Sequence, residues 1–197
     1  MGNVFFTSDT HFGHKLMLRR QNLTREQLYG MSPVTLDQSI QAMDEEMIQA
    51  WNRVVGKSDR VYHLGDVSLH KPPRTREILS RLNGFIYLIR GNHEDAAENG
   101  ICKPRFMWIK DYLYFKINNE KIVLCHYPMA SWRSSHHGSW MLHGHSHGTL
   151  KEPYLMKRLD VGIDVWKRPI SYEEVAALMQ ERKFVATDGH IPGILAE

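Results

Sequence analysis

Residues 85–94 read FIYLIRGNHE, an apolar run of five residues that ends in an Arg-Gly-Asn-His-Glu cluster. A continuous apolar run of this length predicts a buried strand. In α/β folds, functional sites assemble from the loops at the carboxyl ends of strands. The stretch therefore predicts a core strand and, directly after it, a group of side chains at the edge where a site would form.

Four other segments of the chain repeat this arrangement. Each is a short apolar run that ends in Asp or His, usually beside Gly: Val4–Thr7 before Asp9 and His11, Val61–Leu64 before Asp66, Ile122–Cys125 before His126, and Trp140–Leu142 before His145 and His147. Asp-Thr-His or Gly-Asp alone occurs by chance in many proteins, and His-Gly-His-Ser-His alone could be a surface loop. Five such strand ends in one chain instead indicate that these side chains converge on one site.

The longest predicted helix covers residues 36–52. Its apolar side chains fall on one face at helical spacing: Leu36, Ile40, Met43, Met47, Ile48 and Trp51. Thr35 and Gln38 are expected to form the capping box at its start.

Shorter elements complete the predicted α/β pattern. Helices are predicted for residues 74–82 and for about 172–183, and Ser171 with Glu174 forms a capping box for the second. The polar pair at residues 118–119 separates two apolar runs and is typical of a β-hairpin.

The bulk properties suit a single domain spanning residues 1–197. The formal net charge of +3 is small and gives no reason to expect a nucleic-acid or membrane partner. No apolar run is long enough to span a bilayer, and the first residues lack the pattern of a signal peptide, so we expect a cytoplasmic protein. Cys102 and Cys125 lack a metal-like spacing and are expected to be free thiols.

The candidate side chains are those that two adjacent divalent ions require. Each ion needs several oxygen or nitrogen ligands, one carboxylate must bridge them, and a position must stay open for water and substrate. Asp66 is a natural bridging carboxylate, because Gly65 before it lets other backbone approach closely. Asp9 and His11 are two residues apart, so on extended backbone both would reach one ion. The remaining candidate ligands are Asn92, His126, His145 and His147.

Together the five blocks resemble the signature of the calcineurin-like metallophosphoesterases. The blocks are Asp9-x-His11, Gly65-Asp66, Gly91-Asn92-His93-Glu94, His126 and Gly144-His145-x-His147. The longer phrases DTHFGH at 9–14 and LCHYP at 124–128 are similar to a small microbial and phage branch of that superfamily. The resemblance implies an α/β fold in which two β-sheets pack face to face as a sandwich flanked by helices.

The resemblance also implies a role for each residue. One metal ion would be held by Asp9, His11 and His147, the other by Asn92, His126 and His145, and Asp66 would bridge the two. His93 would face the substrate and protonate the leaving-group oxygen, or stabilise charge on the phosphoryl group. Manganese is the first expectation for both ions, although Fe, Zn, Ni and Co suit the same donors.

The expected activity is hydrolysis of phosphodiester or phosphomonoester bonds by hydroxide formed at the metal ions, with small nucleotides as expected substrates. A nuclease acting on nucleic-acid ends is an alternative, and it would need a basic groove with stacking aromatics. The candidate aromatics are Trp108, Tyr127, Trp132 and Trp140, but the sequence has no dense basic run.

Two further alternatives fit the sequence less well. A non-catalytic scaffold of the same fold would be expected to lose ligands, and none is missing. Phosphoprotein phosphatases of the superfamily have Asp and Arg after the second Gly-Asp block, whereas Val67 and Ser68 follow it here. This difference argues against a phosphoprotein phosphatase.

A few residues outside the ligand set are candidates for contact with the substrate. His14 follows the first block, and Arg133 follows the His126 loop, where its guanidinium could bind two phosphate oxygens. A position on the surface is an equally good explanation for both. The interval 12–60 is long and is expected to shape the pocket. If a helix begins there, Lys15 and Arg19 would share one face and could meet further phosphate groups.

Overall fold

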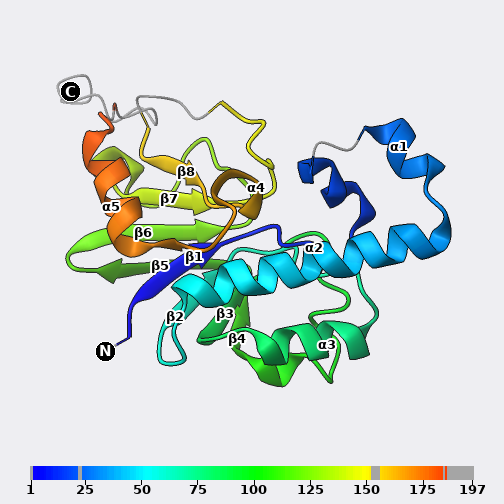
Figure 1. The fold of residues 1–197 in the computed structure, drawn as a ribbon. Coiled ribbons are helices and arrows are strands. Elements are labelled where there is room, and N and C mark those ends of the chain that lie inside the picture. Colours follow the sequence, from blue (N-terminus) through cyan, green and yellow to red (C-terminus); the bar gives the residue numbers. More distant parts are fainter. Residues whose placement is uncertain (1, 22–23, 152–155, 184, 186–197) are drawn as a thin grey trace, which may run out of the picture.

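The first of two β-sheets has the spatial strand order β4-β3-β2-β1-β9 (Figure 1). In the computed structural model, which describes residues 2–21, 24–151, 156–183 and 185, these strands are β1 Val4–Thr7, β2 Arg60–His63, β3 Phe85–Ile89, β4 Phe106–Lys110 and β9 Ile170–Ser171. Strands β1 to β4 are parallel, and β9 is antiparallel to β1. The carboxyl ends of the parallel strands therefore lie along one edge.

The second sheet has the order β5-β6-β7-β8, with strands β5 Tyr112–Ile117, β6 Glu120–Cys125, β7 Trp140–His143 and β8 Arg158–Asp160. Strands β6, β7 and β8 are parallel, whereas β5 and β6 form an antiparallel hairpin. Its two-residue turn has φ of 47° at Asn118 and 69° at Asn119, as a type I′ turn requires. The predicted hairpin is therefore confirmed.

Apolar side chains fill the space between the two sheets. Phe6 of β1 belongs to one buried cluster with Leu124 of β6 and Leu142 of β7. Tyr62 of β2 stacks on Phe6 with ring centroids 5.7 Å apart, and meets Phe115 of β5 at 5.1 Å. The two-sheet α/β sandwich predicted from the sequence is confirmed.

Helices cover the outer face of the first sheet. Helix α2, Pro33–Val54, and helix α3, Pro72–Arg81, lie over it (Figure 1). Trp51 of α2 and Ile78 of α3 are each 1% exposed and share a buried cluster with Ile86 of β3. Because α2 comes from the long interval between the first two blocks, that interval supplies part of the core as well as surface.

Helix α2 begins at Pro33, three residues before the predicted helix at 36–52. Ser32 is its N-cap, and the Ser32 hydroxyl accepts a hydrogen bond from the N–H of Thr35 at 3.2 Å. The predicted capping box of Thr35 and Gln38 is therefore wrong, because Ser followed by Pro is a stronger start signal. Helix α3 likewise begins at a proline, two residues before its predicted start at 74.

The predicted capping box of Ser171 and Glu174 is present at the start of helix α5, Tyr172–Glu181, which ends two residues before its predicted end. The other helical segments are α1 Arg25–Gly30, α4 Ile163–Trp166, and the 3₁₀ helices η1 Lys15–Gln21, η2 Lys103–Arg105 and η3 Ser135–His137. Within the described ranges, every helix is too short or too polar to cross a bilayer. Cys102 and Cys125 are buried free thiols, as predicted.

Replacing Trp51 by alanine should destabilise the protein by about 3–5 kcal/mol, because it leaves a cavity under α2 and removes the donor to the carbonyl of Asn83. Urea unfolding followed by circular dichroism would measure this loss. Val34→Ala is the control on the same helix, since Val34 is 67% exposed, and it should change stability by less than about 0.5 kcal/mol. Equal effects of the two changes would contradict the placement of this helix face in the core.

Candidate metal centre

The predicted ligands lie together at the carboxyl ends of β1, β2, β3, β6 and β7. Asp66 lies at the middle of the group: its Oδ2 is 3.3 Å from Nε2 of His11 and 3.7 Å from Nε2 of His126. These two imidazoles come from opposite sheets. The Asp66 carboxylate therefore lies between two sets of donors, as a bridging ligand would.

One set of donors surrounds Asp9. Its Oδ1 lies 4.0 Å from Nε2 of His11 and 4.0 Å from Nε2 of His147, and the three side chains could hold one ion. The second set surrounds Asn92. The Oδ1 of Asn92 lies 3.0 Å from Nε2 of His126 and 2.9 Å from Nδ1 of His145. His126 also lies within reach of a shared ion with Asp9 and Asp66, so the division of the donors between two ions stays a prediction.

Most of these residues have an uncommon backbone conformation. Asp9, His11, Asp66, His145 and His147 have φ of 56°, 43°, 59°, 66° and 50°, in the left-handed region. The argument that Asp9 and His11 reach one ion from extended backbone is therefore wrong. Both side chains reach the site because the chain turns at each of them.

Hydrogen bonds between neighbouring loops hold these turns. The N–H of Asp9 donates to the carbonyl of Gly65 at 2.9 Å, and the N–H of His11 donates to the carbonyl of Asp66 at 3.0 Å. The N–H of His145 donates to the Asp9 carboxylate, with 3.0 Å to Oδ2. Each strained loop is thus fixed by an adjacent one.

Glu94 ties the second and third blocks together. It is 6% exposed, and its Oε1 accepts hydrogen bonds from the N–H groups of Asp66 and Gly91. Gly91 must be glycine, because a Cβ there would lie 2.2 Å from the Asp66 carboxylate. The N–H of His93 donates to Oδ1 of Asp66 at 2.8 Å, so the same loop also positions His93.

Hydrogen bonds at Nδ1 orient two of the candidate imidazole ligands. Nδ1 of His126 lies 2.7 Å from the carbonyl of Leu64, and Nδ1 of His147 lies 2.5 Å from Oδ2 of Asp164. When Nδ1 donates its proton in this way, Nε2 keeps a lone pair for a metal ion. Sequence reasoning missed Asp164 of α4, because no motif surrounds it and only the fold brings it to His147.

Burial sets the protonation of the centre. It raises the pKa of Asp9 to about 7 and lowers the pKa of His11 to about 3. Burial also lowers the pKa of His126. His11 and His126 are therefore neutral donors near pH 7, and burial disfavours the charged form of Asp9. Buried carboxylates beside neutral imidazoles fit divalent cations.

A cavity of about 680 Å³ opens above these side chains. Its walls include the predicted residues His11, His14, Asp66, Asn92, His93, His145 and His147, together with Leu16, Met17 and Asp164. His93 is exposed here, and its ring centroid lies 5.7 Å from that of His11. Leu16 and Met17 come from η1, so the interval 12–60 does shape the pocket.

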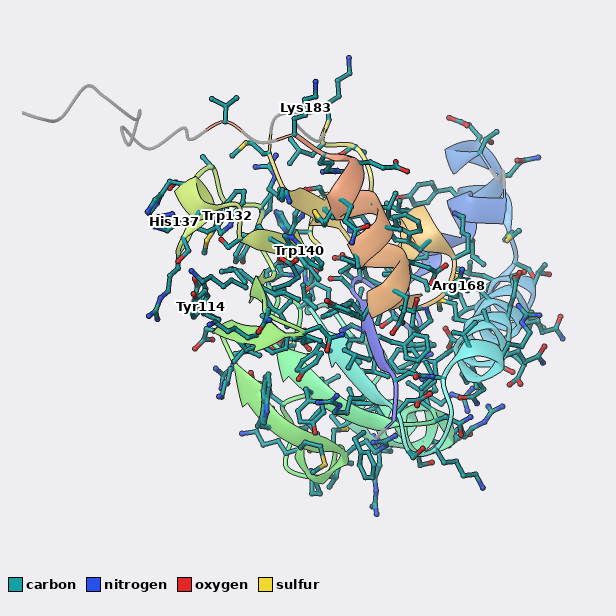
Figure 2. All side chains as sticks on the ribbon, turned by 90° about the vertical axis from the view of Figure 1, so that its left-hand side faces the viewer. Tyr114, Trp132, His137, Trp140, Arg168 and Lys183 are labelled. Atoms are coloured by element: carbon teal, nitrogen blue, oxygen red, sulfur yellow. The ribbon has the colours of Figure 1, made fainter. Side chains whose placement is uncertain are left out.

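The substrate-contact predictions have different outcomes. His14 lines the cavity, with its ring centroid 5.5 Å from that of His11. Arg133 does not, because its guanidinium lies 4.3 Å from the ring centroid of Tyr114. Figure 2 labels Tyr114 on one side of the molecule together with Trp132 and His137. The expectation that Arg133 meets substrate phosphate is therefore corrected: it stacks on β5 instead.

The expected pair of Lys15 and Arg19 does not have the expected geometry. Residues 15–21 form a 3₁₀ helix, in which residues four apart do not share a face. The Lys15 ammonium lies 5.1 Å from the ring centroid of Tyr29. The side chain of Arg19 lies outside the described part of the chain.

Most of the candidate aromatic side chains are not free to stack on nucleic-acid bases. Trp132 and Trp140 are buried, and Trp108 packs on Tyr87 with ring centroids 5.2 Å apart. Tyr127 is 47% exposed, and its ring centroid lies 4.8 Å from that of His145. One of the four predicted aromatics is therefore both exposed and close to the centre.

The sequence model of the calcineurin-like phosphoesterase family matches residues 2–194. An uncharacterised protein of Methanocaldococcus jannaschii is 30% identical over 195 residues, covering 95% of this chain and 97% of that protein. The Gene 66 protein of Mycobacterium phage L5 is 27% identical over 209 residues, covering 91% and 95%. A solved protein of unknown function from Aquifex aeolicus has the same fold, with a TM-score of 0.65 and 22% identity over 90% of this chain and 100% of that chain.

The stability of the metal-free protein should fall by about 2 kcal/mol between pH 7 and pH 8.5. Burial raises the pKa of Glu94 to about 8 and that of Asp9 to about 7. In this window the native state holds more protons than the unfolded chain, so raising the pH favours unfolding. Urea unfolding in the presence of a chelator at the two pH values would measure the change.

The variant Glu94→Gln should lose most of this pH dependence, because glutamine does not titrate. Glu181→Gln is the matched control, since Glu181 is exposed, and it should keep the pH dependence. Wild-type stability that is constant or rises across this window would contradict the assignment of buried, protonated carboxyl groups.

Proposed function

The chain belongs to the calcineurin-like phosphoesterase family, and from that premise we propose that it is a metal-dependent hydrolase of phosphate esters. The proposal is supported chiefly by one observation: carboxylate, amide and imidazole donors from five loops surround Asp66 at the base of an open cavity. A binding scaffold that had lost catalysis would have no reason to keep this full set.

We assign the donors to two divalent ions. Asp9, His11 and His147 would hold one ion, Asn92, His126 and His145 the other, and Asp66 both. When bound, such ions supply charge neutralisation for the phosphoryl group and lower the pKa of water. Manganese is the expected metal, and Fe, Zn, Ni or Co would suit the same donors.

His93 is the proposed catalytic residue. It lies outside the two donor sets, faces the cavity, and has its backbone fixed to the Asp66 carboxylate. An imidazole so placed can give a proton to the leaving-group oxygen as the phosphorus–oxygen bond breaks. His14 lies on the same cavity and would contact the phosphoryl group from the side of η1.

The expected substrates are small phosphate esters of the nucleotide type. The cavity is wide and has an apolar wall at Leu16 and Met17, and the exposed Tyr127 beside His145 adds one aromatic face. A nuclease would need a row of such aromatics along a basic groove. With Trp132 and Trp140 buried, the small-molecule substrate is the better supported proposal.

Asp66→Asn should weaken both metal sites together, because one carboxylate serves both ions. Elemental analysis of the purified variant after dialysis should give much less than two ions per chain, whereas Asp37→Asn on the surface of α2 should keep the wild-type content. Full occupancy in the Asp66 variant would show that the bridging assignment is wrong.

The wild-type protein should hydrolyse bis-para-nitrophenyl phosphate with added manganese and lose that activity in chelator. His93→Ala should keep its metal content and lose turnover by about 10²–10⁴-fold, as expected for a missing general acid. The loss should be smaller with para-nitrophenyl leaving groups than with alkyl ones, which need a proton more.

His137→Ala is the matched control, because His137 is an exposed histidine that is not among the residues lining the cavity. Equal losses for good and poor leaving groups would argue that His93 stabilises charge instead of donating a proton. A loss of metal from the His93 variant would make that residue a ligand.

A further inference from the structure

A second cavity of about 260 Å³ adjoins the first, and the two share His93 in their walls. Its other walls come from the segments that follow β2 and β3, and include Leu69, His70, Pro72, Asp95 and Ala96. Binding sites for small molecules usually begin near about 300 Å³. This cavity therefore suits one ring-sized group of a larger ligand that also occupies the first cavity.

The wall at His70 is held by a buried carboxylate from another part of the chain. Nε2 of His70 lies 2.6 Å from Oδ2 of Asp44 in α2. Asp44 is fully buried, and its Oδ1 accepts the N–H of Gly13 at 2.9 Å. The imidazole also packs against Gly13, because a Cβ there would lie 2.7 Å from the ring. The His70 ring thus has a single fixed position.

The wall at Leu69 is fixed in a similar way. The N–H of Leu69 donates to the carbonyl of Phe12 at 2.9 Å, and the Ser68 hydroxyl donates to the same carbonyl at 3.2 Å. That hydroxyl also lies 2.9 Å from the hydroxyl of Thr75 in α3. A pocket formed before the ligand arrives lowers the entropy that binding must overcome.

The position of His93 indicates which part of a substrate would enter the second cavity. In phosphoryl transfer the attacking and leaving oxygens lie roughly in line on opposite sides of phosphorus. His93 is assigned to the leaving oxygen, an assignment that rests on the function proposed above. The group attached to that oxygen must then extend past His93, which is where the second cavity lies.

The chemistry of the walls limits what that group can be. Leu69, Pro72 and Ala96 are apolar, and the one carboxylate among the lining residues is Asp95, with neither Lys nor Arg among them. An exposed carboxylate about 6 Å from a second phosphate would weaken its binding by about tenfold at low salt. An uncharged group with an apolar face meets no such penalty.

We propose that this cavity is the subsite for the leaving alcohol, and that it selects uncharged, ring-containing alcohols such as nucleosides over alcohols that carry further phosphate. The bond changes are those of hydrolysis. A water oxygen joins phosphorus and releases a proton to solvent, the bond from phosphorus to the alcohol oxygen breaks, and the alcohol leaves with the proton from His93, which takes up a proton from solvent before the next turnover.

Two substrates of the same ester type test the proposal: adenosine 5′-monophosphate, whose leaving group is adenosine, and adenosine 3′,5′-bisphosphate, whose leaving group carries a phosphate. The wild-type manganese-loaded protein should prefer the first in kcat/KM by about tenfold or more. Asp95→Asn should bring the ratio close to one, and Asp95→Lys should reverse it. High salt should reduce the wild-type preference.

Filling the cavity provides a second measurement that does not depend on turnover. Ligand-observed NMR should detect adenosine binding to the wild-type protein, and Leu69→Trp should reduce this binding by at least about tenfold by occupying the space. The controls are Asp37→Asn and Val34→Trp, which lie at exposed positions on α2 and should leave both measurements unchanged.

The outcomes separate the subsite from the proposed function. If bis-para-nitrophenyl phosphate is hydrolysed but the substrate ratio is the same in wild type and Asp95→Asn, the subsite proposal is overturned and the hydrolase proposal stands. If no ester is hydrolysed, the hydrolase proposal fails, and adenosine binding decides the subsite. The subsite proposal is overturned if adenosine does not bind to the wild-type protein, or if Leu69→Trp leaves adenosine binding unchanged.

Discussion

Left-handed backbone at the predicted ligands is the feature on which the rest of the site depends. Asp9, His11, Asp66, His145 and His147 all have φ between 43° and 66°. Each such residue costs about 1 kcal/mol or more, so the group uses a substantial part of the net stability of a domain, which is about 5–15 kcal/mol. The β-sandwich compensates for this free-energy cost. Its strands end at one edge, where neighbouring loops hydrogen-bond to one another and to the carboxylates between them.

The same turns gather carboxylates and imidazoles in a place where water solvates them poorly. Burial raises the pKa of Asp9 to about 7 and lowers that of His11 to about 3. Without a cation the cluster is therefore unfavourable in its ionised form, and a ligand that binds only the native state would stabilise the fold. Strain, burial and the donor set all favour binding of divalent cations, and the exposed His93 at the rim is placed where it would provide the acid for the proposed ester hydrolysis.

The sequence predicts that the candidate ligands lie close together, because each follows an apolar run and parallel strands bring such positions to one edge of a sheet. The sequence predicts fewer of the residues and strands that hold the ligands in position. Strand β8 has three residues, too few for a pattern, and Asp164 reaches His147 only through the tertiary fold. The closeness of Arg133 to His126 in the sequence predicts a position near the substrate, but the Arg133 guanidinium stacks on Tyr114 instead. Contacts between residues far apart in the sequence leave no motif in the local sequence.

Two cations are proposed to occupy this cluster with Asp66 between them. Anomalous diffraction from crystals grown with manganese tests this proposal most directly, because it locates each ion independently of the protein coordinates. We expect two peaks about 3.5–4 Å apart, as in other two-metal sites. One should lie beside Asp9, His11 and His147, and the other beside Asn92, His126 and His145. A single peak, or peaks away from the Asp66 carboxylate at saturating manganese, would contradict the proposal.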